Sequence, residues 1–158
     1  MSNAHARLTE LGIALPPAPA PAASYVPTRL VPISDERALL FIAGQVSRDG
    51  QNLLSGRCPD EVNVEEASRR ARVCAVNILA QIEAAAGLDN LEQLVQLTGF
   101  VLSADGFGDQ PKVINGASEF LIDVLGDAGR HSRMALGTNA LPFSSTVEIA
   151  AVAVVRTR

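Results

Sequence analysis

Residues 146–155 read Thr-Val-Glu-Ile-Ala-Ala-Val-Ala-Val-Val, an apolar run in which Glu148 carries the only charge. A short apolar run rich in β-branched residues is typical of a strand. A strand with one face in water would alternate polar and apolar side chains, whereas this run is apolar on both faces. We therefore predict a strand covered on both sides, with Glu148 paired or placed at a cleft because a buried lone charge is costly.

The composition predicts one folded domain. Of 158 residues, 47% are hydrophobic and 19% charged, which provides enough apolar side chains for a core. The net charge of −4 argues against a nucleic-acid partner, and no apolar run is long enough to predict a membrane span. Cys58 and Cys74 fit neither a disulfide scaffold nor a zinc site, so we expect a reduced, cytoplasmic protein.

Periodicity and turn residues predict the order β-β-α-β-α-β-β. The expected strands cover residues 25–33, 38–46, 94–104, 132–138 and 146–155, and the expected helices cover about 63–86 and 110–125. Asn63 with Glu66 resembles a capping box, and Asp109 is the expected cap of the second helix. Cys74 falls in the apolar stripe of the first helix and is expected in the core.

The first residues differ in composition from the rest. Residues 5–13 are expected to form a short helix, and the prolines among residues 15–24 exclude a regular helix or a central strand. We therefore divide the chain into an N-terminal extension with a Pro/Ala-rich connector, residues 1–24, and a single domain, residues 25–158.

Two helices cannot cover both faces of a five- or six-stranded sheet, so we expect both on one face of an α+β fold. The other face of a mixed sheet would then present apolar strands such as 146–155. An uncovered apolar face predicts a homo-oligomer.

Several pieces of the sequence carry a family resemblance through their order and spacing. The pieces are Tyr25, residues 42–45, Asn115, Arg133, Leu141-Pro142 and Glu148-Ile149. Together they resemble the Rid family of reactive intermediate deaminases, also called YjgF-type or L-PSP endoribonuclease-like proteins, in a divergent branch with a longer N-terminus. The resemblance implies a chorismate-mutase-like fold and a homotrimer whose sheets line a central barrel, with three clefts between subunits.

The resemblance also implies hydrolysis of 2-imino or enamino acids to 2-keto acids and ammonia. Arg133 would hold the substrate carboxylate with its planar fork, or else form a structural ion pair or lie at the surface at a strand end. Glu148 would activate water, because loss of solvation raises the pKa of a carboxyl, or else it lies exposed at a frayed strand start. Arg133 is the expected neighbour of Glu148 across the connection between the last two strands.

The remaining candidate residues have weaker support. Tyr25 would close the cleft or bond the substrate, unless it only packs, and Asn115 would bond the substrate, fix Arg133 or face water. His131 is expected to be a loop residue without a catalytic role.

The chain departs from the family pattern at three positions. Ala43 stands where the family has Ser, Ala135 where it has Cys, and Ala150 where it has a second Glu. Ala43 and Ala135 would line the cleft without offering side-chain hydrogen bonds. The sequence therefore does not identify the substrate.

The leading hypothesis is an imine deaminase with a small-molecule substrate. The alternative is a non-catalytic homotrimer that binds a small carboxylate as a sensor or scaffold. A ribonuclease is disfavoured by the acidic composition and the single Tyr, and a mutase would rest on fold alone. We expect no metal or organic cofactor, because the sequence has neither a ligand cluster nor a phosphate-binding Gly loop.

Overall fold

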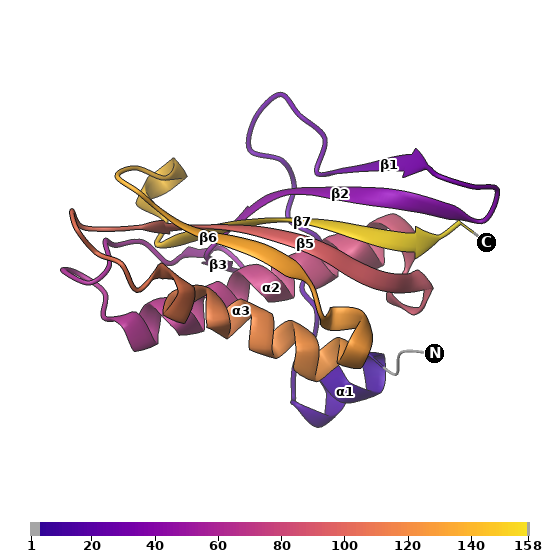
Figure 1. Cartoon of the computed structure of the whole chain (residues 1–158), viewed down its shortest axis with the longest axis horizontal. Helices are drawn as coiled ribbons and strands as arrows, with labels where there is room; N and C mark the ends of the chain where they lie inside the picture. The colour runs from indigo at the N-terminus through magenta and orange to yellow at the C-terminus, as the bar shows by residue number, and fades with distance from the viewer. Residues whose placement is uncertain (1–3, 158) are drawn as a thin grey trace.

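The structure is a computed structural model that describes residues 4–157 (Figure 1). The strands of its main sheet are β1 (Thr28–Pro32), β2 (Arg37–Val46), β5 (Leu91–Leu102), β6 (Ser132–Thr138) and β7 (Val147–Arg156). The α-helices are α1 (Ala4–Glu10), α2 (Val64–Ala86) and α3 (Gln110–Leu125). The predicted order of strands and helices is confirmed, and each predicted helix or strand lies within three residues of its expected bounds.

The five main strands lie in the spatial order β1-β2-β7-β5-β6. The pair β5–β6 is parallel and the other pairs are antiparallel, so the sheet is mixed, as predicted. The last strand in the sequence therefore occupies the centre of the sheet, between β2 and β5.

The two faces of β7 differ within one chain, whereas the sequence predicts a strand covered on both sides. Val147, Ile149 and the odd-numbered residues after them are buried under the helices. Glu148 and the even-numbered residues point to the opposite face and are partly exposed. Figure 1 shows α2 and α3 on one side of the sheet, which confirms the predicted one-sided layer.

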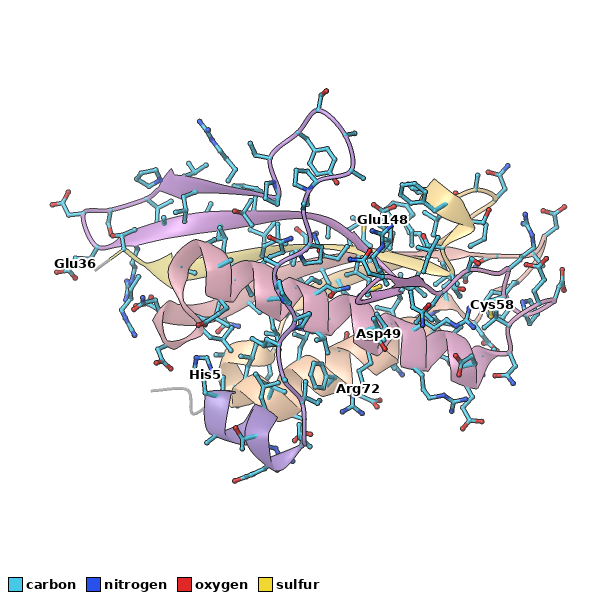
Figure 2. All side chains as sticks on the ribbon, turned by 180° about the vertical axis from the view of Figure 1, so that it is seen from behind. His5, Glu36, Asp49, Cys58, Arg72 and Glu148 are labelled. Atoms are coloured by element: carbon cyan, nitrogen blue, oxygen red, sulfur yellow. The ribbon has the colours of Figure 1, made fainter. Side chains whose placement is uncertain are left out.

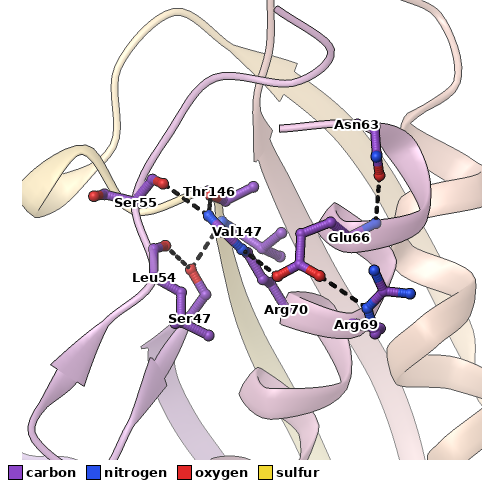
Figure 3. Close-up of polar contacts among 9 residues, drawn as sticks. All are labelled: Ser47, Leu54, Ser55, Asn63, Glu66, Arg69, Arg70, Thr146 and Val147. Carbon is purple, nitrogen blue, oxygen red and sulfur yellow. Dashed lines mark hydrogen bonds and ion pairs between the residues drawn. The ribbon is translucent and has the colours of Figure 1, made fainter. Parts of the chain in front are cut away.

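Helix α2 begins where the sequence predicts. Asn63 Oδ1 accepts a hydrogen bond from the Glu66 backbone N–H at 2.8 Å, which satisfies one of the free donors of the first turn (Figure 3). The Glu66 carboxylate does not complete the capping box and instead pairs with Arg69 and Arg70. Cys74 is fully buried among the core side chains, as predicted.

Helix α3 begins differently from the prediction. Asp109 makes no side-chain capping bond, and its carboxylate pairs with Lys112 Nζ at 3.1 Å. Its backbone φ of −93° and ψ of 22° lie outside the extended region that a capping residue normally adopts.

The face of the sheet without helices is apolar and open. Phe41, Met134 and Leu136 are 43%, 46% and 43% exposed, from strands at both sides of the sheet. An apolar surface of this kind is typical of a protein interface, and oligomer formation stays a prediction.

Three segments depart from the sequence prediction. Strand β1 begins at Thr28, so Tyr25 lies in the loop before it; Pro27, just before the strand, has no N–H to donate to a ladder. Strand β5 begins earlier than expected because Leu91 pairs with Val155 of β7. The loop after β2 forms a small hairpin, β3 (Arg48–Asp49) and β4 (Asn52–Leu53).

The N-terminal extension packs against the rest of the chain. Leu8 of α1 is buried in the core cluster, and Arg7 pairs with Asp123 of α3 at 2.7 Å. The connector then runs past α2 to a loop above β2 (Figure 1). The domain boundary at residue 25 stays a prediction. Within residues 4–157, no helix is both long and apolar enough to cross a bilayer.

The crossing of α2 and α3 allows a test of packing. A Cβ atom at residue 116 would overlap the backbone carbonyl oxygen of Ser68 on α2. Gly116→Ala should lower the free energy of unfolding by about 1–2 kcal/mol, because this overlap exceeds the helix propensity that Ala gains over Gly. Urea unfolding measures the change. Gly108→Ala is the control, since a Cβ there meets open space, and equal stability of both variants would refute the close crossing.

Candidate functional site

A pocket of about 470 Å³ opens beside Glu148. Its walls are connector residues 19–23, the end of β2 at residues 43–46, and the short 3-10 helix η3 (Pro142–Ser144). In Figure 2, Glu148 lies where the connector, β2 and the loop before β7 meet. The pocket thus joins segments from both ends of the chain.

Glu148 is held against a bulge in β2. The register between β2 and β7 shifts between Ile42 and Gln45, and Val46 then pairs with Glu148. A Cβ atom at residue 44 would come within 2.9 Å of the Glu148 carboxyl carbon, so only Gly44 allows this approach. Bulges commonly redirect side chains next to active sites.

The Glu148 carboxyl is half-buried and has no ion-pair partner within the described part of the chain. Burial raises the pKa of Glu148 above its ordinary value, which is the direction the sequence predicts. A carboxyl of raised pKa without a cation beside it is suited to accept and release a proton.

The pocket brings together Tyr25, Ala43 and Glu148 of the predicted site. The Tyr25 hydroxyl oxygen accepts a hydrogen bond from the Ala22 backbone N–H at 3.3 Å, so Tyr25 stays against the connector. Its side chain is 47% exposed at the mouth of the pocket. This place is compatible with closing the pocket, and a role toward substrate stays a prediction.

The other predicted residues, Arg133, Asn115 and Ala135, lie apart from this pocket. Arg133 is on edge strand β6, where it donates to Asn115 Oδ1 at 2.8 Å, to Ser118 Oγ at 2.9 Å and to the Pro111 carbonyl oxygen at 3.2 Å. Asn115 therefore holds Arg133, one of the roles left open for it. Ala135 packs against the core.

The expected contact between Arg133 and Glu148 is absent within the described residues of one chain. Strand β5 lies between β6 and β7, so the two side chains belong to strands that are not neighbours. They also point to opposite faces: Arg133 bonds to α3 on the helix-covered face, whereas Glu148 is on the helix-free face. The expectation fails because β6 is parallel to β5 and joins its outer edge, instead of forming a hairpin with β7.

His131 lies in the loop before β6, as predicted, and its ring makes hydrogen-bond contacts on both nitrogens. Its Nδ1 lies 2.6 Å from the Gly129 carbonyl oxygen, which is only an acceptor, so Nδ1 carries the proton. Its Nε2 then accepts from Ser118 Oγ at 2.9 Å, and that oxygen accepts from Arg133. Burial lowers the pKa of His131, which favours this neutral form. His131 therefore positions Arg133 through Ser118.

A chain of buried amides holds the connector, and it was not predicted. Gln81 Nε2 of α2 donates to the Pro19 carbonyl oxygen at 2.7 Å and lies 3.5 Å from Gln45 Oε1. Gln45 Nε2 donates to the Ala43 carbonyl oxygen at 2.9 Å. The only sequence signal is a Gln between the apolar neighbours Ala80 and Ile82 in α2.

Arg48 and Phe143 also line the pocket and were not predicted. The Arg48 guanidinium carbon lies 5.6 Å from the centre of the Phe143 ring. Phe143 has a left-handed backbone, with φ 58° and ψ 21°, and Ser144 follows with φ 54°. Such strain in residues other than Gly is often found at functional sites.

The start of β7 is fixed to α2 by polar contacts (Figure 3). Arg70 donates to Thr146 Oγ1 at 2.9 Å and to the Ser55 carbonyl oxygen at 2.7 Å. Ser47 Oγ accepts from the Val147 backbone N–H at 3.3 Å and donates to the Leu54 carbonyl oxygen at 2.8 Å. Glu148 follows directly, so these contacts limit the movement of its backbone. Across residues 4–157, no cluster of three His, Cys, Asp or Glu side chains is arranged to hold a metal ion.

A mixed sheet with two long helices on one face defines an α+β protein of the chorismate-mutase-like class. The family described as "YjgF/chorismate_mutase-like, putative endoribonuclease" matches residues 5–154. The chain therefore belongs to this family, and the match includes most of the N-terminal extension.

Individual relatives match over nearly the whole chain. Protein TCP17 of Trypanosoma cruzi is 37% identical over 93% of this chain and 91% of its own length. A protein of unknown function from Agrobacterium tumefaciens is 39% identical, with a TM-score of 0.85, over 96% of this chain and 91% of its own. A Shewanella oneidensis protein described as a "putative endoribonuclease" is 29% identical, with a TM-score of 0.88, over 95% and 97% of the two chains.

The amide chain predicts how the connector is held in place. Gln81→Leu should speed amide exchange in residues 20–25, because the connector loses the hydrogen bond at the Pro19 carbonyl oxygen. It should also lower the free energy of unfolding by about 1–3 kcal/mol, because the Gln45 amide loses a buried partner. Hydrogen exchange and urea unfolding measure the two effects. Gln51→Leu in the exposed β3–β4 turn is the control. Unchanged exchange in Gln81→Leu would show that the connector is held by other contacts.

Proposed function

We propose that this protein hydrolyses 2-imino or enamino acids to 2-oxo acids and ammonia, with Glu148 as the general base. The observation that carries the proposal is the half-buried Glu148 carboxyl in a pocket, without an ion-pair partner among the described residues. Membership of the YjgF/chorismate mutase-like family supports it.

The chemistry needs one group that moves protons. Glu148 takes a proton from water as the water oxygen attacks the iminium carbon, and a carbinolamine forms. Glu148 then returns the proton to the nitrogen, the C–N bond breaks and ammonia leaves. The remaining hydroxyl becomes the carbonyl and releases its proton, so the iminium ion and water give the 2-oxo acid and ammonium.

The working unit in this proposal is a homotrimer with a pocket at each interface. The open apolar face formed by Phe41, Met134 and Leu136 supports assembly, because burying such a surface is favourable. Arg133 lies on edge strand β6, and in this arrangement we assign it to the pocket of an adjacent copy. In this arrangement it contributes to holding the substrate carboxylate.

A second function, non-catalytic binding of a small carboxylate, is favoured by one observation. Ala43 lines the pocket with a methyl group only, and Ala135 packs into the core, so neither supplies a side-chain hydrogen bond. A ribonuclease, which the Shewanella relative's description names, has less support, because the chain's net charge is −4.

The role of Glu148 is tested by removing its basicity while keeping its shape. Glu148→Gln should lower the rate of imine hydrolysis at least about 100-fold, because the water loses its general base. An amino-acid oxidase supplies the imine, and semicarbazide traps what remains. Glu36→Gln is the matched control. Glu36 is exposed and lies next to the end of β7 that is farthest from Glu148 (Figure 2).

The outcomes of this assay separate the two functions. Wild-type protein that lowers the semicarbazone signal supports the deaminase. If folded wild-type protein leaves the signal unchanged across a panel of amino acids, the deaminase is refuted. Binding of 2-oxo acids would then support the carboxylate-binding alternative.

The raised pKa of Glu148 predicts a pH-dependent effect on stability. Ionising this carboxyl costs more in the folded protein than in the unfolded chain, so the cost is present above the folded-state pKa and absent below the ordinary pKa. Glu148→Gln should therefore be more stable than wild type near pH ~7, and the difference should disappear below pH ~4. Urea midpoints at both pH values measure it. An equal difference at both values would indicate a packing effect instead.

A further inference from the structure

The pocket beside Glu148 contains a cation from the same chain. Arg48 lines the pocket at the start of β3, two residues after β2 ends at Val46. Its Nε atom is buried and has no hydrogen-bond partner among the described residues. A buried N–H group without a partner is unusual in a folded protein, which indicates that a ligand or water completes its bonding.

Two contacts hold the Arg48 backbone and lie beside its guanidinium group. Asn77 of α2 is buried and donates through Nδ2 to the Arg48 carbonyl oxygen at 2.8 Å. The Phe143 ring lies 5.6 Å from the guanidinium carbon, from a backbone in the left-handed region. Neither contact uses a guanidinium N–H group, because Asn77 binds the backbone carbonyl of Arg48 and the Phe143 ring faces the guanidinium carbon.

Arg48 and Glu148 are opposite charges in one pocket, yet they form no ion pair among the described residues. If the two groups were paired, neither would be available for chemistry. Both side chains line the same pocket, so a ligand bound there has a cation and a proton acceptor within one cavity. A 2-imino acid has the matching order of groups, a carboxylate followed by the carbon that water attacks.

Apart from the amides of Gln45 and Asn77, the rest of the pocket is lined mainly by apolar groups. Its wall consists of the prolines and alanines of residues 19–23, together with the Tyr25 and Phe143 rings. These surfaces offer no charge to a second acidic or basic group of a ligand. The apolar surfaces suit a ligand with a short hydrocarbon side chain.

We propose that Arg48 binds the substrate carboxylate in this pocket, and that the substrates are small imino acids with one carboxylate and an apolar side chain. The inference rests on the proposed function and deepens it. Arg48 shares a chain with Glu148, so the anion-binding group and the base keep a fixed relation inside each subunit. Arg133 of an adjacent copy adds to this site and does not replace it.

The test measures binding of 2-oxobutanoate, the product of such an imine, and of its uncharged methyl ester by calorimetry. Wild-type protein should bind the acid at least about ten-fold more tightly than the ester. Arg48→Met should weaken acid binding by a similar factor and leave ester binding unchanged, because only the carboxylate loses its partner. Arg130→Met, which removes an exposed Arg beside Asp127, is the matched control.

A conservative variant guards against a folding defect. Arg48→Lys keeps the charge and loses the planar fork, so its affinity for the acid should lie between wild type and Arg48→Met. The proposal is refuted if Arg48→Met binds the acid as tightly as wild type, or if wild type does not distinguish the acid from the ester.

The proposed function and this inference can fail separately. Absence of turnover, with acid binding that depends on Arg48, would refute the deaminase and support the anion site. Turnover that needs Glu148, with a KM and acid affinity unchanged in Arg48→Met, would support the deaminase and refute the role of Arg48.

Discussion

The register of β7 between β2 and β5 is the constraint on which the rest of the structure depends. Side chains along a strand alternate between faces, so the pairing of Val46 with Glu148 decides which residues enter the core. In this register, Val147 and Ile149 meet the helices, and Glu148 reaches the open face beside Gly44. A shift by one residue would place the carboxyl in the core and expose Val147 and Ile149. The hydrophobic core and the pocket are therefore set by the same pairing.

Polar contacts secure that register at the end where the pocket lies. Arg70 and Ser47 bind the backbone or side chains on either side of the β7 start, while the amides of Gln45 and Gln81 fix the bulge and the connector. The groups are buried or partly buried, where a lost partner is expensive. The same end of the sheet holds the half-buried carboxyl, and these contacts offset the cost of keeping it there.

Local patterns predicted the helices and the strands, because each depends on the spacing of apolar residues along the sequence. They could not predict which strands are neighbours, so the contact of Arg133 with Glu148 was expected across a connection that instead spans β5. The contacts of Gln81, Arg48 and His131 join segments far apart in the sequence or depend on side-chain orientation. The spacing of apolar residues along the sequence gives no information about such contacts. Glu148 was predictable because a lone charge in an apolar strand is visible in the sequence itself.

The connector has a consequence for how the shape of the pocket can change in this family. Its prolines and alanines form one wall of the pocket, yet they belong to no strand of the sheet and take no part in the pairing that sets the register of β7. Proline also limits the conformations of the unfolded segment, so the segment loses little conformational entropy when it is held as a wall of the pocket. Substitutions in residues 19–23 can therefore reshape the pocket while the sheet and the Glu148 carboxyl stay as they are. The shape of this wall and the fold of the sheet therefore depend on different residues of the chain.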